Sequence, residues 1–342
     1  MKVLLSGYQG FGNLGDEAIA RALVDALQAR GHTPMLLSGA PVETRREWGV
    51  PAYHRIRGLL PALVTADVVV SGGGGLLQDV TSARSLRYYL GVLRLARWLG
   101  TPSVVFGQSI GPLSPSGRRA VARTLRGVPC LVRDEASRDL LNGLGVDASV
   151  VPDAALGLAL PEEADAAADV ERGGVLLVPR SDVPGASVAF AHLAERLVAQ
   201  GVRVTTLPLD QPADSEEADA LARRPGVTRL EANDPREVLS LVAAADLVVS
   251  VRLHGLILAA RMGVPHVGVG YDPKVAGFTR TTGAPLLPVP VDADDLLAVV
   301  ERTLDEATRL RAEASERSRV LLQETEAGFD ALDAAIRACV GG

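Results

Sequence analysis

The chain has 342 residues, enough for two domains of about 150 residues that each bury their own core. Its formal net charge of −6 argues against a protein that coats nucleic acid, because such proteins need an excess of Lys and Arg over Asp and Glu. With 47% hydrophobic and 22% charged residues, the composition is that of a globular protein and excludes extensive disorder.

Cys130 and Cys339 are the two cysteines, too few for a disulfide framework and without the spacing of a zinc site. The five histidines show no metal-ligand spacing either, so we expect no metal. Apolar runs fall short of the roughly 20 residues that span a bilayer, and the run at the start is shorter than that of a signal peptide. These features predict a cytoplasmic protein.

Short apolar, β-branched runs alternate along the chain with longer Ala- and Leu-rich segments of helical period. The first run leads through a glycine-rich turn into a predicted helix over 16–29. Such alternation predicts parallel sheets covered by helices on both faces. Strands are expected at 3–5, 68–70, 104–106, 175–178, 202–207, 247–250 and 266–269.

A weak internal repeat supports two similar halves. ADVVVS at 66–71 and ADLVVS at 245–250 are each followed by a predicted helix, a Gly-x-Pro turn and another strand. Such strands are common in any doubly wound sheet, so the repeat adds to the strand pattern and does not stand alone. We predict an α/β fold with two Rossmann-like domains facing a cleft, in which ligands bind beyond the carboxyl ends of the strands.

The domain boundaries follow from composition. We predict an N-terminal Rossmann-like domain over 1–160 and a C-terminal one over 175–315, joined by an acidic, Ala-rich linker at 161–174. A long charged helix ends the chain, and its last part, 316–342, could pack back on the first domain.

The first candidate site is GYQGFGNLGDE, from Gly7 to Glu17, directly after the first strand. Its glycines let the backbone approach a ligand, and a helix that begins near Asp16 would direct its N–H groups toward that ligand. The spacing is not that of a dinucleotide-binding fingerprint. Asn13 or Asp16 could contact a ligand, or Asp16 could simply cap the helix.

Four glycines, 72–75, form the second candidate and precede Gln78 and Asp79. A tight turn seldom needs four glycines, which cost conformational entropy and allow close backbone approach. We therefore favour a substrate-binding loop over a plain turn.

The third and strongest candidate is SVRLHG at 250–255, between a buried strand and a predicted helix. Arg252 and His254 flank the start of that helix, which suits an anion site with an ionisable group beside it. A lone histidine is more often structural, but the strand-end position and the neighbouring Arg favour a chemical role here. Each further cation could be a solvated charge, yet together they predict a site for a small, multiply charged anion: Lys274, Arg180 and, from the first domain, Arg133.

Residues 84–99 form an amphipathic segment in which four arginines alternate with aromatic and leucine residues. Such a segment suits a membrane interface. A helix that merely covers a sheet would look similar, and we favour that interpretation unless the acceptor is lipid-linked.

Together, these segments resemble the polysaccharide pyruvyl transferase family, and most closely its CsaB type, which modifies secondary cell-wall polymers. The motifs run in chain order to about Phe278 and are jointly specific: GYQGFGNLGDEAI, GGGGLLQD, GQSIGPL at 107–113, VRDEAS at 132–137 and VRLHGLILAA at 251–260. The resemblance implies a fold similar to GT-B glycosyltransferases. It also implies transfer of the pyruvyl group of phosphoenolpyruvate onto a 4,6-diol of N-acetylmannosamine on a lipid-linked precursor, which forms a cyclic ketal and releases phosphate.

In that chemistry phosphoenolpyruvate is a co-substrate, and no cofactor is expected. The family's Arg-x-His motif maps onto Arg252 and His254, and we expect Arg180 and Lys274 to help hold the anion. His254 would act as general acid or serve phosphate departure, and Asp16 would orient or deprotonate the sugar. The expected sugar contacts are Asn13, Gly73, Gly74, Gln78, Asp79 and Arg133.

Two other functions remain open. A GT-B glycosyltransferase using a nucleotide-sugar would have the same kind of fold and anion site, although the helix after His254 has no Glu placed to hold a ribose diol. A non-catalytic sensor of a sugar anion is a further possibility. Peripheral contact with the inner membrane face would follow from a lipid-linked acceptor.

Overall fold

The computed structural model describes residues 1–80, 82–160, 173–270 and 272–341. The chain divides into two compact units: unit 1 comprises Met1–Phe11, Asp16–Leu158 and Gln323–Gly342, and unit 2 comprises Gly12–Gly15 and Ala159–Leu322. Of the predicted linker, residues 161–172 lie outside the described residues, and Gly173 and Gly174 lead directly into a strand of unit 2.

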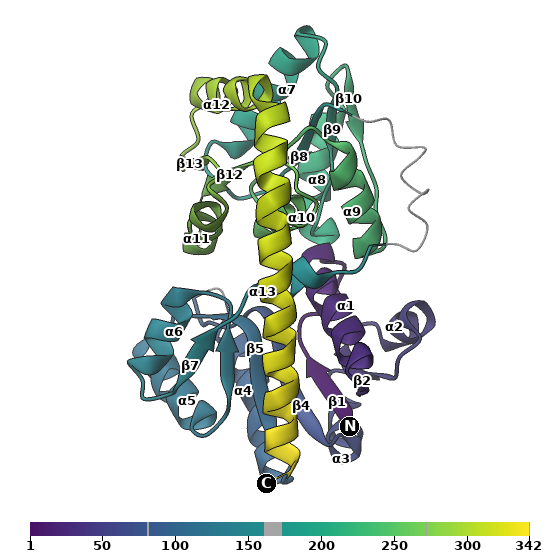
Figure 1. Cartoon of the computed structure of the whole chain (residues 1–342), viewed down its shortest axis with the longest axis vertical. Coiled ribbons are helices and arrows are strands. Elements are labelled where there is room, and N and C mark those ends of the chain that lie inside the picture. Colours follow the sequence, from purple (N-terminus) through teal and green to yellow (C-terminus); the bar gives the residue numbers. More distant parts are fainter. Residues whose placement is uncertain (81, 161–172, 271, 342) are drawn as a thin grey trace. The chain divides into compact units, whose positions relative to one another are not determined.

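Unit 1 contains a seven-stranded, fully parallel sheet in the order β3-β2-β1-β4-β5-β6-β7 (Figure 1). Its strands are β1 (Lys2–Ser6), β2 (Thr33–Ser38), β3 (Ala52–His54), β4 (Val68–Leu77), β5 (Ser103–Ile110), β6 (Cys130–Val132) and β7 (Ala148–Val150). Its helices are α1 (Leu14–Ala29), α2 (Pro41–Trp48), α3 (Leu59–Thr65), α4 (Ala83–Trp98), α5 (Pro115–Leu125), α6 (Glu135–Asn142) and the short 3-10 helix η1 (Ala154–Gly157).

Unit 2 contains a six-stranded parallel sheet in the order β10-β9-β8-β11-β12-β13. Its strands are β8 (Val175–Val178), β9 (Val204–Thr206), β10 (Val227–Arg229), β11 (Leu247–Ser250), β12 (His266–Gly270) and β13 (Leu286–Pro288). Its helices are α7 (Ala186–Ala199), α8 (Gln211–Ala222), α9 (Pro235–Ala244), α10 (Leu253–Arg261), α11 (Pro273–Thr282), α12 (Ala293–Asp305) and the first part of α13 (Ala307–Gly341).

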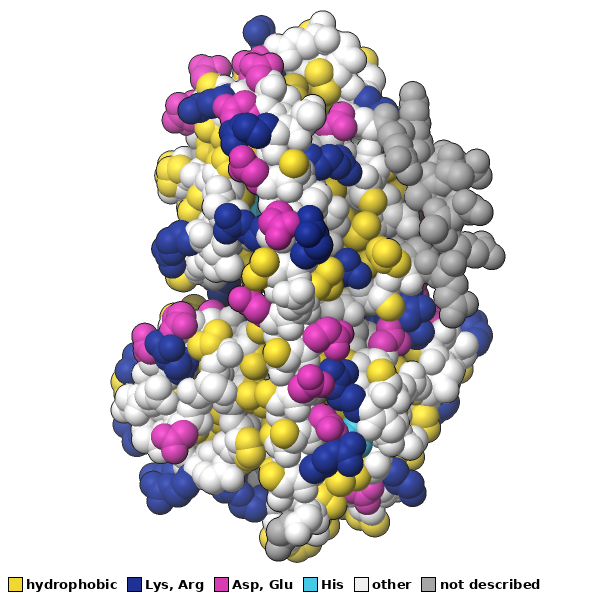
Figure 2. Space-filling model, viewed as in Figure 1, with side chains coloured by type: hydrophobic (Ala, Val, Ile, Leu, Met, Phe, Trp, Pro, Cys, Tyr) yellow, Lys and Arg dark blue, Asp and Glu magenta, His cyan; other side chains and the backbone are white. Residues whose placement is uncertain are grey.

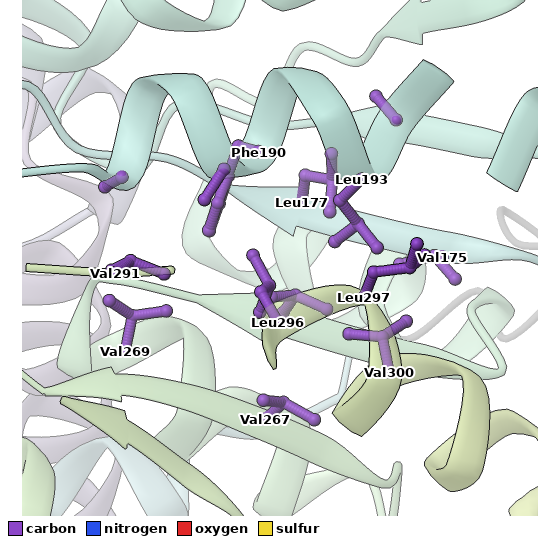
Figure 3. Close-up of a cluster of buried hydrophobic side chains, with 14 of the residues drawn as sticks. Val175, Leu177, Phe190, Leu193, Val267, Val269, Val291, Leu296, Leu297 and Val300 are labelled. Carbon is purple, nitrogen blue, oxygen red and sulfur yellow. The ribbon is translucent and has the colours of Figure 1, made fainter. Parts of the chain in front are cut away.

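The central strands of both sheets are buried along almost their whole length because helices cover both faces. In unit 2, Phe190 and Leu193 of α7 pack against Leu177 of β8, and Leu296 and Val300 of α12 belong to the same buried cluster (Figure 3). This arrangement confirms the predicted α/β fold with two Rossmann-like domains.

The two ends of α13 are held in different ways. In unit 2, Ser318 Oγ donates to the Arg261 carbonyl (2.7 Å), and Arg311 donates to the carbonyls of Ala243 and Ala245. In unit 1, the Phe329 ring is buried and stacks on Phe106 with 6.0 Å between ring centroids. Both segments of the helix are therefore built into a core.

The prediction of a loop at the four glycines was wrong. Residues Gly72–Gly75 lie inside β4, and Gly72 and Gly74 pair with Phe106 and Gln108 of β5. The reason is packing against α1: a Cβ on Gly73 would lie 2.0 Å from the Ile19 side chain. The glycines let a buried strand and a helix approach more closely than side chains would allow.

Candidate active site

Four neighbouring strands of unit 2 end in charged residues at one edge of the sheet. Asp210 follows β9, Arg180 follows β8, Arg252 and His254 follow β11, and Lys274 follows β12. The carboxyl ends of parallel strands lie at the same edge, where ligands bind in doubly wound sheets. The structure therefore brings the four residues predicted to bind the anion to this edge, namely Arg180, Arg252, His254 and Lys274. We call it the β8–β11 edge.

Arg252 is anchored by a buried carboxylate that sequence analysis missed. Its Nε donates to Asp214 Oδ2 (2.7 Å) and its Nη2 to Asp214 Oδ1 (2.5 Å), a bidentate pair. Nη2 also lies 3.2 Å from Asp210 Oδ2. The Asp214 side chain is fully buried, whereas that of Arg252 retains 15% exposure. The two aspartates thus hold the guanidinium in one orientation at the start of α10.

The pKa of Asp214 is raised, first because burial removes the carboxylate from water and despite the opposing effect of the Arg252 hydrogen bonds and charge. A buried carboxylate beside one cation is stabilised only while that cation remains in place. The geometry makes the orientation of Arg252 and the ionisation of Asp214 mutually dependent.

The turn into α10 requires a glycine after His254. Ser250 Oγ donates to the carbonyl of Arg252 (2.6 Å), which closes the turn between β11 and the helix. A Cβ on Gly255 would lie 2.3 Å from that same Oγ. The backbone N–H groups of the first turn of α10 therefore open at the β8–β11 edge, where a helix N-terminus favours an anion.

The segment Gly12–Gly15 forms one wall beside His254. Leu14 N–H donates to the Leu209 carbonyl (2.7 Å), and the Gln211 N–H donates to the Gly12 carbonyl (3.1 Å). A Cβ on Gly15 would lie 2.2 Å from Nδ1 of His254. The imidazole therefore packs directly on the Gly15 backbone, and no other residue type fits there without moving the ring.

Asn13 is a structural member of this wall. Its Oδ1 accepts the Gly15 N–H (3.1 Å), and its Nδ2 donates to Asp210 Oδ2 (3.4 Å). Asp210 therefore links the Gly12–Gly15 segment to Arg252. The GNLGD motif and the Arg-x-His motif, far apart in sequence, meet through this aspartate.

Arg180 and Lys274 are half-buried at neighbouring strand ends. The Lys274 N–H donates to Asp272 Oδ1 (2.9 Å), which caps α11 and places Lys274 in its first turn. Cations beside a helix N-terminus can bind a dianion, and an imidazole next to them can transfer a proton to or from it. In the described ranges, no cluster of three or more His, Cys, Asp or Glu side chains is arranged to hold a metal ion.

The predicted residues of unit 1 fall into separate groups. Asp16, in the first turn of α1, lies against β4, since a Cβ on Gly74 would be 2.8 Å from Asp16 Oδ1. The two carboxylate oxygens of Asp79 accept from the N–H (2.8 Å) and Oγ (2.5 Å) of Ser114 at the start of α5, and the pKa of Asp79 is lowered mainly by the Ser114 hydroxyl. Gln78 is half-buried just before Asp79.

Arg133 is held in a buried ion pair. Its Nη1 donates to Asp153 Oδ2 (2.5 Å) and its Nε to Ser109 Oγ (2.7 Å), with side-chain exposures of 7% for Arg133 and 5% for Asp153. Ser109 in turn donates to Asp134, the N-cap of α6. These bonds tie β5, β6 and the segment after β7 together, so the structure gives Arg133 a structural role that the sequence did not reveal.

Glu17 is the other ionisable group that sequence analysis passed over. It accepts the Gly10 N–H (2.5 Å) and so closes the glycine-rich turn after β1. Burial is the largest cause that raises its pKa to about 7, and the neighbouring Asp16 charge adds to the effect. The sequence did contain a signal for this role: two adjacent acidic residues, Asp16 and Glu17, stand at the start of α1, although one is enough to cap a helix.

Comparison with solved structures shows the same two-domain, GT-B-like α/β fold in other proteins. The chain is similar to Anabaena HepE in complex with UDP-glucose (17% identity, 100% of this chain and 99% of that chain, TM-score 0.62). It is also similar to a glycosyltransferase from Rickettsia africae (10% identity, 99% and 98%, TM-score 0.65). A third match is a UDP-GlcNAc 2-epimerase from Neisseria meningitidis (11% identity, 98% and 99%, TM-score 0.65). At these identities the likeness shows the fold alone.

Residues 13–273 match the polysaccharide pyruvyl transferase family over most of both units. The chain therefore belongs to this family, and it is a transferase at that level of description. The match begins at Asn13 of the wall beside His254, includes Arg180, Arg252 and His254 of the β8–β11 edge, and ends one residue before Lys274.

Proposed function

We propose that this protein transfers the pyruvyl group of phosphoenolpyruvate onto the 4,6-diol of a terminal N-acetylmannosamine in a lipid-linked cell-wall polysaccharide precursor. The observation that carries the proposal is the β8–β11 edge, where Arg180, Arg252, His254 and Lys274 follow three adjacent strands. Family membership supports pyruvyl transfer, while the sugar and its lipid carrier rest on the resemblance to the CsaB type.

Phosphoenolpyruvate carries a carboxylate and a phosphate on one carbon, so its site needs two sets of donors. The N-terminus of α10 and the guanidinium of Arg252 suit one planar anionic group. Arg180 and Lys274, at the ends of the flanking strands β8 and β12, suit the other. Because Asp214 and Asp210 orient Arg252 beforehand, little order is lost when the donor binds.

The two acceptor hydroxyls supply both protons that the overall reaction requires. Proton delivery to the methylene carbon, by His254 in this proposal, gives a methyl group and cationic character at the central carbon, to which the first sugar oxygen bonds. Phosphate then leaves, and the second sugar oxygen closes the ketal. One hydroxyl proton ends in the methyl group and the other leaves with phosphate, so His254 returns to its starting state.

The acceptor side of the proposal rests on unit 1 and the glycine-rich segment. Asp16 follows Gly15 directly in the chain and is assigned the orientation or deprotonation of a sugar hydroxyl. Asn13, Gln78 and, through their backbone, Gly73 and Gly74 of β4 remain proposed sugar contacts, although both glycines are buried. Asp79 and Arg133 are assigned to the support of these contacts, because each already binds neighbouring protein groups.

The test is phosphate release from phosphoenolpyruvate with and without a β-N-acetylmannosaminyl-terminated lipid disaccharide. We expect phosphate to appear only with the acceptor, together with a product whose mass rises by one pyruvyl ketal. Turnover of a nucleotide-sugar without any use of phosphoenolpyruvate would instead identify a glycosyltransferase, and binding of phosphoenolpyruvate without turnover would identify a sensor.

A further inference from the structure

One stretch of the chain lacks acidic residues entirely. No Asp or Glu occurs in residues 80–133, which contain nine arginines, although the whole chain has a net charge of −6. A second acid-free stretch, residues 48–66, contains Arg55 and Arg57. Positive charge is therefore concentrated in the segments that form α4 and α5, and Arg55 and Arg57 add two charges just before α3, which itself has none.

These three helices cover the same face of the unit 1 sheet. Ala62 and Leu63 of α3 pack in one buried cluster with Val92 and Ala96 of α4. Other α4 residues pack in a second cluster with Val121 of α5. Since α4 contributes to both clusters, it lies between α3 and α5 (Figure 1). The acid-free segments thus form one continuous layer, which we call the α3–α5 face.

Two arginines of α4 are used inside this layer. Arg94 Nε donates to Thr124 Oγ1 (2.9 Å), and Arg97 Nη2 donates to the carbonyls of Thr124 (2.7 Å) and Arg126 (3.0 Å) at the end of α5. Arg94 and Arg97 thus join α4 to α5, as expected for the sheet-covering helix that sequence analysis favoured for segment 84–99. In the described part of the chain, the arginines on the outside of the layer form no ion pair with a carboxylate: Arg84, Arg87, Arg118, Arg119, Arg123 and Arg126.

The same layer exposes large apolar side chains. Trp98, at the end of α4, is 79% exposed, and Ile56, Leu60 and Val64 are 68%, 51% and 70% exposed. Leu60 and Val64 are one helical turn apart on the outside of α3. On α4 the exposed residues Arg84, Arg87, Arg94 and Trp98 recur at helical spacing and share one side of the helix.

We propose that the α3–α5 face docks on the surface of an anionic lipid bilayer. Arginines would contact lipid phosphates while Trp98 and the apolar side chains of α3 enter the headgroup region, the combination that peripheral membrane helices use. None of the helices in the described ranges is both long enough and apolar enough to span a bilayer, so this is surface binding.

Charge favours a bilayer over other occupants. A nucleic acid would be repelled by the overall acidic chain once it extended beyond this face. The exposed side of α13, in contrast, carries acidic and basic side chains interspersed along its length (Figure 2). A flat lipid surface meets only one face of the protein, so the local excess of arginine decides the interaction.

The test uses the full chain and vesicles without any substrate, so it does not depend on the proposed function. We expect co-sedimentation with vesicles rich in phosphatidylglycerol, weak binding to phosphatidylcholine vesicles, and loss of binding as salt increases. The chain has two tryptophans, so in the Trp48→Phe variant the tryptophan fluorescence comes from Trp98 alone. Its emission should shift to the blue on anionic vesicles, whereas Trp98→Phe should show no such shift.

Charge removal provides the matched comparison. Arg84→Gln/Arg87→Gln/Arg118→Gln/Arg119→Gln should weaken vesicle binding more than about a hundredfold, because each arginine near such a surface contributes about fivefold. The control Arg309→Gln/Arg319→Gln removes exposed arginines from α13, which lie in ion pairs with glutamates, and should leave binding unchanged within about twofold.

Equal binding to neutral and anionic vesicles, or the same loss in both variants, would overturn the proposal. So would absence of vesicle binding. If the chain then dimerised and the α3–α5 variant abolished the dimer, the face would be an interface between copies of this chain instead. Neither result would bear on pyruvyl transfer to a water-soluble acceptor, which reports on the proposed active site and not on the α3–α5 face.

Discussion

Asp214, in the first turn of α8, accepts hydrogen bonds from both Nε (2.7 Å) and Nη2 (2.5 Å) of Arg252. The carboxylate is fully buried and the guanidinium is largely so. This pair determines where the guanidinium of Arg252, two residues before His254, can point. The donor site is therefore organised by a residue that does not have to touch substrate.

Asp214→Asn should uncouple this pair. The variant replaces the bidentate, buried carboxylate with a neutral amide and leaves Asp210, 3.2 Å from Nη2, beside the guanidinium, so we expect a loss of about 3 kcal/mol in the free energy of unfolding. We also expect the KM for phosphoenolpyruvate to rise at least about tenfold while substrate still turns over. Urea denaturation and steady-state kinetics measure the two effects.

The matched control is Asp219→Asn on the same helix, because Asp219 forms a half-exposed ion pair with Arg229. That variant should lose less than about 1 kcal/mol and keep the KM of the parent protein. An unchanged KM in Asp214→Asn, with the expected loss of stability, would show that Arg252 acts independently of Asp214.

Gly15→Ala should displace His254. The added Cβ would overlap Nδ1 of the imidazole, so the ring must rotate or the Gly12–Gly15 segment must move. We expect kcat to fall about a hundredfold, as misplacement of a catalytic group by an ångström does. Gly277→Ala in α11 is the control, since a Cβ there meets nothing within 4 Å, and it should stabilise the protein slightly without affecting kcat. Full activity in Gly15→Ala would argue that His254 needs no fixed position.

Glu17 should make stability depend on pH in a defined window. Its pKa is raised from 4.5 to about 7 in the folded chain, so below pH 4.5 both states hold the proton and the group contributes nothing. As the pH rises from 4.5 to 7, the unfolded chain releases the proton first, and stability falls by about 3 kcal/mol. Above pH 7 the loss is complete.

In Glu17→Gln this decline should disappear, because the amide oxygen can still accept the Gly10 N–H but cannot ionise. Urea unfolding from pH 4.5 to 8 measures the difference between the two proteins. Glu43→Gln, an exposed position on α2, should follow the parent curve. Parallel curves for the parent and Glu17→Gln would show that the buried carboxyl ionises normally.

The fold was accessible from sequence because its signal is local. Apolar runs at β8, β11 and β12 alternate with helical segments, and this alternation is nearly sufficient to infer a parallel sheet. The placement of Arg180, Arg252, His254 and Lys274 at one edge followed from the same rule about strand ends.

What the sequence could not provide were partners distant along the chain. Asp214 lies 38 residues before Arg252, and Asp153 lies 20 residues after Arg133. Nothing local distinguishes either aspartate from an exposed one. The glycines of β4 were misassigned for a similar reason, since Gly73 leaves room for Ile19 of α1 and Gly74 for Asp16.

The measurement that tests the central claim most directly is acceptor-dependent phosphate release from phosphoenolpyruvate by His254→Ala beside His192→Ala. His192 lies on α7, away from any strand end and partly exposed next to Asp294. We predict that His254→Ala loses at least about a thousandfold in kcat while His192→Ala retains the parent rate. Near-normal turnover in His254→Ala, or equal losses in both variants, would contradict the assignment of the reaction to the β8–β11 edge.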